Sequence, residues 1–195
     1  MKALIGMSGG VDSSVAALLM KEQGCDCIGA TMRLYAGQTA APDGSKTCCS
    51  LDDVEDARAV ARRLEIPHYV FNFTDDFYRE VVDKFVDTYY TGGTPNPCID
   101  CNRFLKFGKL LQRARELGCD CVVSGHYARV EQDKATGRYL LKRAADTAKD
   151  QTYFLACLSQ EQLAHVQFPL GALTKEQEVG GQAVFRKTRV SYNSL

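Results

Sequence analysis

Short apolar runs alternate with amphipathic stretches along most of this chain. The four apolar runs are Ala3–Gly6, Cys27–Met32, His68–Phe73 and Cys121–Ser124. Each run is followed by a loop and then by a helical pattern. A strand followed by a crossover helix favours parallel βαβ units. We therefore expect an α/β fold with an open, doubly wound, Rossmann-like parallel sheet. The polar stretch Arg129–Lys142, with its turn at Ala135-Thr136-Gly137, predicts a small hairpin appendage.

The first amphipathic stretch begins directly after the first apolar run. Val11, Val15, Leu18 and Leu19 fall at positions i, i+4, i+7 and i+8. This spacing places four aliphatic side chains on one side of a helix. We expect that side to be buried.

The turn between this strand and helix is rich in glycine and serine, in the run Met7-Ser8-Gly9-Gly10-Val11-Asp12-Ser13-Ser14. Two glycines let the backbone approach an anion, the next helix directs its first N–H groups to the same place, and three serines add donors. Asp12 would repel phosphate unless a divalent cation lay between them, which indicates a magnesium nucleotide. The run matches neither the Walker A pattern nor G-x-G-x-x-G. The alternative is an ordinary glycine turn.

A second candidate centre lies in the run Gly92–Gly108. Its two prolines favour an extended loop, and a helix predicted to begin near Asn102 places Cys101 at a positive helix end, beside two cations. Such surroundings lower a thiol pKa, so Cys101 is a candidate nucleophile. The spacing Cys98-x-x-Cys101 also suits half of a zinc or iron–sulfur site.

Basic side chains follow on the same predicted helix. Lys106, Lys109 and Arg113 fall on one narrow side of it. A stripe of this kind is suited to the phosphates of a polynucleotide, and the alternative is a solvated helix face.

His126 follows the fourth apolar run within Ser124-Gly125-His126-Tyr127-Ala128-Arg129. In an open α/β sheet the carboxyl ends of neighbouring strands form the ligand crevice. We expect His126 to contact substrate or nucleotide there, and the alternative is a histidine that is hydrogen-bonded within its own loop.

Composition and charge narrow the class of protein. The chain has 195 residues, nine cysteines and a formal net charge of zero. It shows neither a signal-type apolar region near its start nor a run approaching a membrane span, so we expect a cytoplasmic enzyme domain with reduced thiols and no membrane partner. The repeated pairs Cys25-x-Cys27 and Cys119-x-Cys121 fall on strands that flank the first strand, and we interpret them as buried thiols.

Four motifs together resemble the MnmA-type tRNA 2-thiouridylases, which belong to the PP-loop ATP pyrophosphatases. In chain order they are GMSGGVDSS, TPNPCIDCNRFLKFG, SGHYAR and KDQTYFL, and the likeness covers residues 2–177. The resemblance implies an adenine nucleotide alpha hydrolase type of sheet. It implies that ATP, with Mg²⁺, adenylates the 2-carbonyl oxygen of the wobble uridine of a tRNA. A cysteine-borne persulfide, received from a sulfur donor protein, then delivers sulfur to the 2-carbon.

The resemblance also implies site residues. Cys101 matches the first catalytic cysteine, and the target base is held at Asn96, Pro97 and Cys98. The tRNA-contacting positions correspond to His126, Lys149, Asp150 and Gln151. The ATP-contacting positions correspond to Gly6, Met7, Ser8, Gly9, Gly10, Val11, Asp12, Ser13, Met32 and Gly125.

The chain departs from the family pattern in two respects. Some members carry Asp where this chain has Cys98, and the C-x-x-C variant is compatible with an iron–sulfur cluster. Members also continue into a linker with a second catalytic cysteine and then a β-rich domain, which this sequence does not contain. We therefore expect an adenylation domain over 1–177 and a poorly ordered tail over 178–195. The remaining alternatives are a PP-loop ligase for a small molecule and a noncatalytic ATP- or iron–sulfur-binding fragment.

Overall fold

The computed structural model describes residues 1–35 and 51–176. In chain order the elements are β1 (Lys2–Gly6), α1 (Val11–Glu22), β2 (Asp26–Arg33), α2 (Leu51–Arg63), β3 (His68–Asn72), α3 (Thr74–Phe77), η1 (Tyr78–Val82), α4 (Asp83–Tyr90), α5 (Pro97–Asp100), η2 (Cys101–Lys109), α6 (Leu110–Glu116), β4 (Cys121–Val123), β5 (Ala128–Gln132), β6 (Tyr139–Arg143), η3 (Thr152–Leu155), α7 (Gln160–Ala164), β7 (Val166–Gln167) and η4 (Pro169–Ala172).

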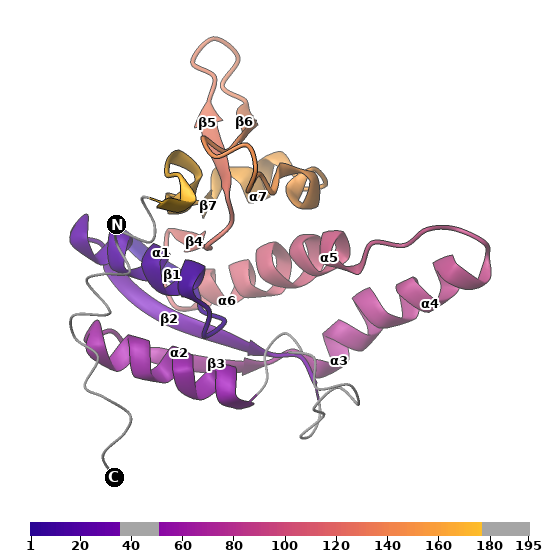
Figure 1. The fold of residues 1–195 in the computed structure, drawn as a ribbon, viewed down its shortest axis with the longest axis horizontal. Coiled ribbons are helices and arrows are strands. Elements are labelled where there is room, and N and C mark those ends of the chain that lie inside the picture. The colour runs from indigo at the N-terminus through magenta and orange to yellow at the C-terminus, as the bar shows by residue number, and fades with distance from the viewer. Residues whose placement is uncertain (36–50, 177–195) are drawn as a thin grey trace.

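The main sheet has five parallel strands in the order β3-β2-β1-β4-β7. The order reverses direction at β1, as in a doubly wound sheet, which confirms the predicted fold class. Strands β5 and β6 form a separate antiparallel hairpin that projects away from the sheet at the top of Figure 1, also as predicted. Strand β7 was not predicted, because two residues are too few to show a periodic pattern.

Alternation along β1 divides the core between the two faces of the sheet. Ala3 and Ile5 pack in one buried cluster with side chains of α1 and α2. Leu4 packs in the opposite cluster with side chains of η2 and α6. Both faces of the sheet are therefore covered by helices, which is the arrangement that parallel sheets require.

The predicted buried side of α1 is right for Val15, which is buried, and wrong for Val11. Val11 is 47% exposed and Leu18 and Leu19 are only partly buried. The buried residues are instead mostly small, and they are Ser13, Ser14, Val15, Ala16, Ala17 and Met20. Alanine and serine allow α1 to lie close against both the sheet and η4, so close approach, more than aliphatic bulk, determines which side is buried.

The helix that carries the two candidate thiols begins earlier than predicted. It starts at Pro97 and not near Asn102, and it continues through α5, η2 and α6 to Glu116. The Asn96 side chain caps this helix by accepting a hydrogen bond of 3.2 Å from the Cys98 N–H, and Pro97 occupies the first helical position. Cys98 therefore lies in the first turn and Cys101 in the second. The same helix runs back toward the sheet from the arm formed by α3, η1 and α4 (Figure 1).

The predicted tail, 178–195, lies outside the described residues. Among the residues that are described, no helix combines the length and the apolar character needed to cross a lipid bilayer.

Candidate active site

The loop after β1 is shaped by one glycine in particular. Gly9 has φ of 73°, and a Cβ at that position would lie 2.5 Å from the Asp53 carbonyl oxygen. No side chain fits this conformation or this space. Among residues 1–35 and 51–176, a Cβ on Gly10 would in contrast meet only the Ser8 hydroxyl, at 3.5 Å. The loop therefore requires glycine at position 9 in order to fold, whereas position 10 has room for a side chain.

The serines of this loop hold its shape. The Ser13 hydroxyl donates to the Gly10 carbonyl at 2.8 Å and accepts from the Ser8 N–H at 3.2 Å. The Ser14 hydroxyl donates to the same carbonyl at 2.9 Å. The prediction that Ser13 and Ser14 serve as free donors is thus corrected, because both hydroxyl protons are used within the loop. The first N–H groups of α1, which no helix satisfies internally, supply the anion-binding character.

The loop after β4 packs directly on the start of α1. A Cβ on Gly125 would lie 2.7 Å from the Asp12 carbonyl carbon and 2.8 Å from the Ser13 nitrogen. Only glycine allows these two backbones to approach so closely. The contact brings His126 and the residues after β4 to the edge of the glycine loop.

Asp12 has a partner that the sequence did not suggest. The Lys175 ammonium lies 2.7 Å from the Asp12 carboxylate, and 5.6 Å from the centre of the Tyr127 ring. These two residues are 163 positions apart in the chain, so no local pattern could have found the pair. A cation is thereby placed at the mouth of the glycine loop.

The helix from Pro97 forms the opposite wall of the site. Cys98 and Cys101 lie one turn apart, Cys98 exposed and Cys101 half-buried, and Lys106 and Phe107 follow farther along. Hydrogen bonds from distant segments hold this helix in place. The Asn102 amide donates to the Phe154 carbonyl at 3.1 Å, and the Gln162 amide donates to the carbonyls of Arg103 and Phe107. The KDQTYFL motif therefore supports the wall that carries the thiols.

His126 lies against two aromatic rings at the end of β4. Its ring centre is 5.9 Å from that of Phe107 and 6.0 Å from that of Phe168. Burial, assisted by the nearby Lys106 ammonium, lowers the pKa of His126 to about 3. The imidazole is therefore uncharged near neutral pH. The neighbouring Gln151 side chain accepts the Tyr127 N–H at 2.9 Å.

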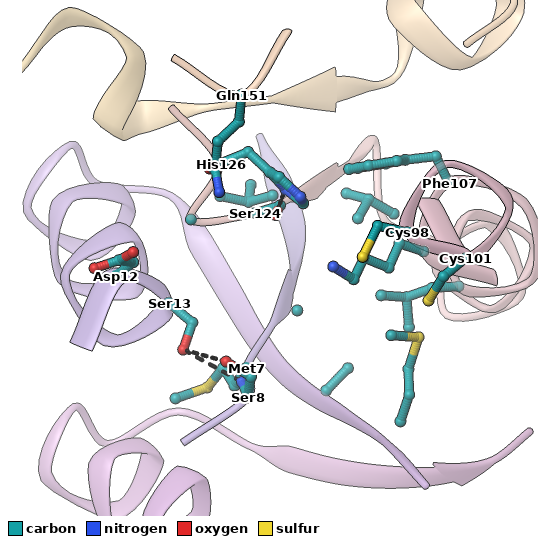
Figure 2. Close-up of a pocket in the computed structure, with 18 of the residues that line it drawn as sticks. Met7, Ser8, Asp12, Ser13, Cys98, Cys101, Phe107, Ser124, His126 and Gln151 are labelled. Carbon is teal, nitrogen blue, oxygen red and sulfur yellow. Dashed lines mark hydrogen bonds between the residues drawn. The ribbon is translucent and has the colours of Figure 1, made fainter. Parts of the chain in front are cut away.

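These walls enclose a cavity of about 290 Å³ at the carboxyl ends of β1 and β4 (Figure 2). The cavity brings together most of the predicted site residues, namely Gly6, Met7, Ser8, Asp12, Ser13, Met32, Cys98, Cys101, Lys106, Gly125, His126 and Gln151. Sequence reasoning missed its apolar lining, which includes Ala30, Leu34, Phe107, Leu110, Val122 and Val123. In the sequence, the pattern around these residues indicates only that they belong to the hydrophobic core.

Other predicted residues do not line the cavity, and they are Gly9, Gly10, Val11, Asn96, Pro97, Arg113, Lys149 and Asp150. Asp150 has a structural role, since it accepts hydrogen bonds from the Ala144 N–H and the Thr152 hydroxyl. Lys149 is exposed.

Within the predicted basic stripe, two cations are paired. The Lys109 ammonium lies 3.1 Å from Asp76, and the Arg113 guanidinium lies 2.5 Å from Glu116. Of the three stripe residues, only Lys106 lines the cavity.

The strand cysteines are unlike those of the cavity. Burial raises the pKa values of the Cys27 and Cys119 thiols, and it raises the pKa of Cys121 to about 11. Across 1–35 and 51–176, no group of three or more His, Cys, Asp or Glu side chains is arranged to hold a metal ion. Within those ranges the donor set beside Cys98 and Cys101 does not fit an iron–sulfur cluster.

Comparison with known proteins places the chain in a family. Residues 1–188 match the family described as the tRNA methyl transferase HUP domain. The chain belongs to this family. Among similar proteins, the tRNA-specific 2-thiouridylase MnmA of Geotalea uraniireducens is 55% identical over 179 residues, which are 90% of this chain and 48% of that protein. The protein of the same name from Moorella thermoacetica is 56% identical over 172 residues, or 88% of this chain and 48% of that protein. The chain thus spans about half the length of these relatives.

Solved structures agree on the HUP-type fold. A 4-thiouridine synthetase solved with RNA and bound ATP matches 94% of this chain and 40% of its own, with a TM-score of 0.55 and 18% identity. A glutamine-dependent NAD+ synthetase from Acinetobacter baumannii, solved with adenosine diphosphate, matches 97% of this chain and 29% of its own, with a TM-score of 0.56 and 14% identity. Both likenesses concern the fold alone.

Proposed function

We propose that this chain is the nucleotide-binding, adenylating half of a tRNA sulfurtransferase that converts the wobble uridine to 2-thiouridine. The observation that carries the proposal is the cavity itself, which is lined both by the loop after β1 and by the thiols Cys98 and Cys101. A nucleotide site and nucleophilic sulfur that share one cavity suit a reaction that activates a carbonyl and then replaces its oxygen with sulfur.

ATP is the first substrate. Its phosphates would lie on the glycine loop at the start of α1, and Asp12 would hold the accompanying Mg²⁺. The Lys175 ammonium, which contacts Asp12 at 2.7 Å, exchanges that contact for a phosphate oxygen when the nucleotide binds. The apolar floor near Met32 receives the adenine ring.

The uridine lies between this loop and the helix that begins at Pro97. Its 2-carbonyl oxygen attacks the α-phosphorus of ATP, an oxygen–phosphorus bond forms, and pyrophosphate leaves. The outer sulfur of a persulfide on Cys101, supplied by a sulfur donor protein, then attacks the 2-carbon and AMP leaves. A second thiol attacks the Cys101 sulfur, which breaks the S–S bond, releases 2-thiouridine and leaves a disulfide. Cys98 borders the target base, Asn96 and Pro97 fix the start of the helix that carries it, and His126 and Gln151 contact the tRNA from the β4 side.

The thiols distinguish this function from its rivals. A methyltransferase, which the family description names, or a ligase for a small molecule requires no cysteine pair in the nucleotide cavity. His126 and the Lys106 ammonium also line the cavity, and an RNA substrate gives both side chains a group to contact. The proposal for this chain is confined to ATP binding, adenylation and the first thiol.

Thiol labelling with ligand protection tests this arrangement. With limiting iodoacetamide at neutral pH, Cys98 and Cys101 are expected to react before Cys27, Cys119 and Cys121, whose pKa values are raised by burial. ATP together with an anticodon stem–loop RNA should protect Cys98 and Cys101 and leave the exposed Cys157, the internal control, unprotected. Equal labelling of the strand cysteines, or equal protection of Cys157, contradicts the proposal.

A further inference from the structure

Ser124 and His126 form a close pair on the cavity wall. The Ser124 hydroxyl oxygen lies 2.5 Å from the His126 Nδ1, which is a short hydrogen bond between a hydroxyl and an imidazole (Figure 2). Both residues line the cavity. The two residues are two positions apart at the end of β4. The backbone of Ser124 is fixed there, because its N–H donates to the Gln167 carbonyl of β7 at 3.1 Å.

The direction of this hydrogen bond follows from the protons available. A neutral imidazole carries one N–H, and its other nitrogen accepts. In the part of the chain that the structure describes, the Ser124 hydroxyl makes no hydrogen bond besides the one to Nδ1. The hydroxyl proton is therefore satisfied when Ser124 donates to Nδ1, which leaves the ring proton on Nε2.

We propose that Ser124 is a positioning residue that holds neutral His126 in the tautomer protonated at Nε2, so that the ring donates one hydrogen bond to an acceptor oxygen of the bound ligand. Gln151 is fixed in a similar manner, because its oxygen accepts the Tyr127 N–H and its NH₂ group remains a donor. The β4 side of the cavity thus presents donors and selects acceptors.

Two groups supply such an oxygen, and this part of the inference rests on the proposed function. One is a phosphate oxygen of ATP, and the other is a carbonyl oxygen of uracil. If the oxygen is that of the uracil 4-carbonyl, the same donor rejects cytosine, which carries an amino group there. Ser124 would then contribute to base choice without touching the base.

The tautomer is measured by NMR on the 195-residue chain labelled with ¹⁵N at its three histidines. The His126 signals are assigned by their loss in His126→Gln. Wild type is expected to show an unprotonated Nδ1 and a protonated Nε2. Ser124→Ala should shift His126 toward a mixture of the two tautomers, whereas the control Ser124→Thr, which keeps the hydroxyl, should retain the wild-type signals. A protonated Nδ1 in wild type, or His126 signals unchanged in Ser124→Ala, overturns the proposal.

Calorimetry then identifies the acceptor. Affinity is measured for ATP alone and for anticodon stem–loops carrying uridine or cytidine at the target position. A uracil acceptor predicts that Ser124→Ala lowers the preference for uridine by about five- to tenfold and leaves ATP affinity unchanged. A phosphate acceptor predicts a similar loss for ATP alone. If neither changes, the donor role is wrong. If wild type binds neither ATP nor RNA, the proposed function fails while the tautomer result stands.

Discussion

At the scale of the residue, the two adjacent glycines Gly9 and Gly10 have different roles, one in the folding of the loop and the other in nucleotide binding. Gly9 has a positive φ and no room for a Cβ, so it serves the fold, while Gly10 has room for a side chain and adjoins the place where phosphates are expected. A substitution at each position therefore has a different expected consequence.

Gly10→Val should fold normally and lose nucleotide affinity by more than about tenfold, because the added carbons occupy the phosphate position. Gly9→Ala, the matched variant, should lower the free energy of unfolding by roughly 1–3 kcal/mol through backbone strain and the clash with Asp53. Calorimetry with ATP and urea unfolding measure the two effects. Unchanged ATP affinity in a folded Gly10→Val protein contradicts the assignment of the loop.

His126 makes stability depend on pH in a window where carboxylates contribute little. Its folded pKa of about 3 lies below the unfolded value near 6.5, so between these values the unfolded chain binds a proton that the folded chain does not. Its stabilising contribution is complete above pH 6.5 and is lost as pH falls toward 3. Between pH 6.5 and 5 the free energy of unfolding should drop by up to about 1.4 kcal/mol per pH unit from this group.

His126→Gln should flatten that slope in urea unfolding followed across the same range. His68 also has a pKa lowered by burial, so the control His68→Gln removes only its own share and keeps the part that belongs to His126. A slope in His126→Gln equal to that of wild type shows that the imidazole is not held uncharged in the folded protein.

Several residue roles could not be predicted from the chain alone. The early helix start at Pro97 depends on the Asn96 cap, and in the sequence the prolines favoured a longer loop. The serines near Gly10 looked like free donors because the sequence does not show which backbone carbonyl is within reach. Lys175 meets Asp12 only through the tertiary fold.

At the scale of the element, the helix from Pro97 to Glu116 carries the cations proposed to meet RNA. Asp76 and Glu116 already pair with Lys109 and Arg113, and these carboxylates compete with phosphate for each cation. Lys106 lines the cavity and is the cation best placed for a ligand.

Lys106→Gln should therefore reduce the slope of log affinity against log salt concentration by about one for a tRNA or anticodon stem–loop. Arg113→Gln is the matched control, with a change expected to be much smaller, because Glu116 already neutralises that side chain. Equal reductions for the two variants would restore the full stripe as the RNA contact, and no change in either would make it a solvated helix face.

Elements of strong pattern were predicted well. The four longer strands and the hairpin were recognisable because apolar runs and turn residues are local signals. Strand β7 has only two residues, and the buried side of α1 is set by contacts with η4 and the sheet. Strand β7 and the buried side of α1 both depend on contacts with residues distant in sequence, and the periodicity of a local segment does not show such contacts.

At the scale of the whole molecule, the sheet topology creates the site. Strands β1 and β4 are neighbours in the sheet but far apart in the chain, and their carboxyl ends bring the glycine loop beside His126. The helix from Pro97 closes the other side with its thiols. The sequence motifs predicted which residues gather here, and the fold supplies how they face one another.

The central claim, that this cavity uses ATP to activate an RNA carbonyl, is tested most directly by the products of ATP cleavage. The 195-residue chain is incubated with Mg²⁺ and ATP labelled at the α- or the γ-phosphate, with and without tRNA, under single-turnover conditions. The account predicts tRNA-dependent formation of pyrophosphate and an adenylyl product, and the loss of both in Gly10→Val. Release of ADP and phosphate, or cleavage that is the same without tRNA, would contradict it.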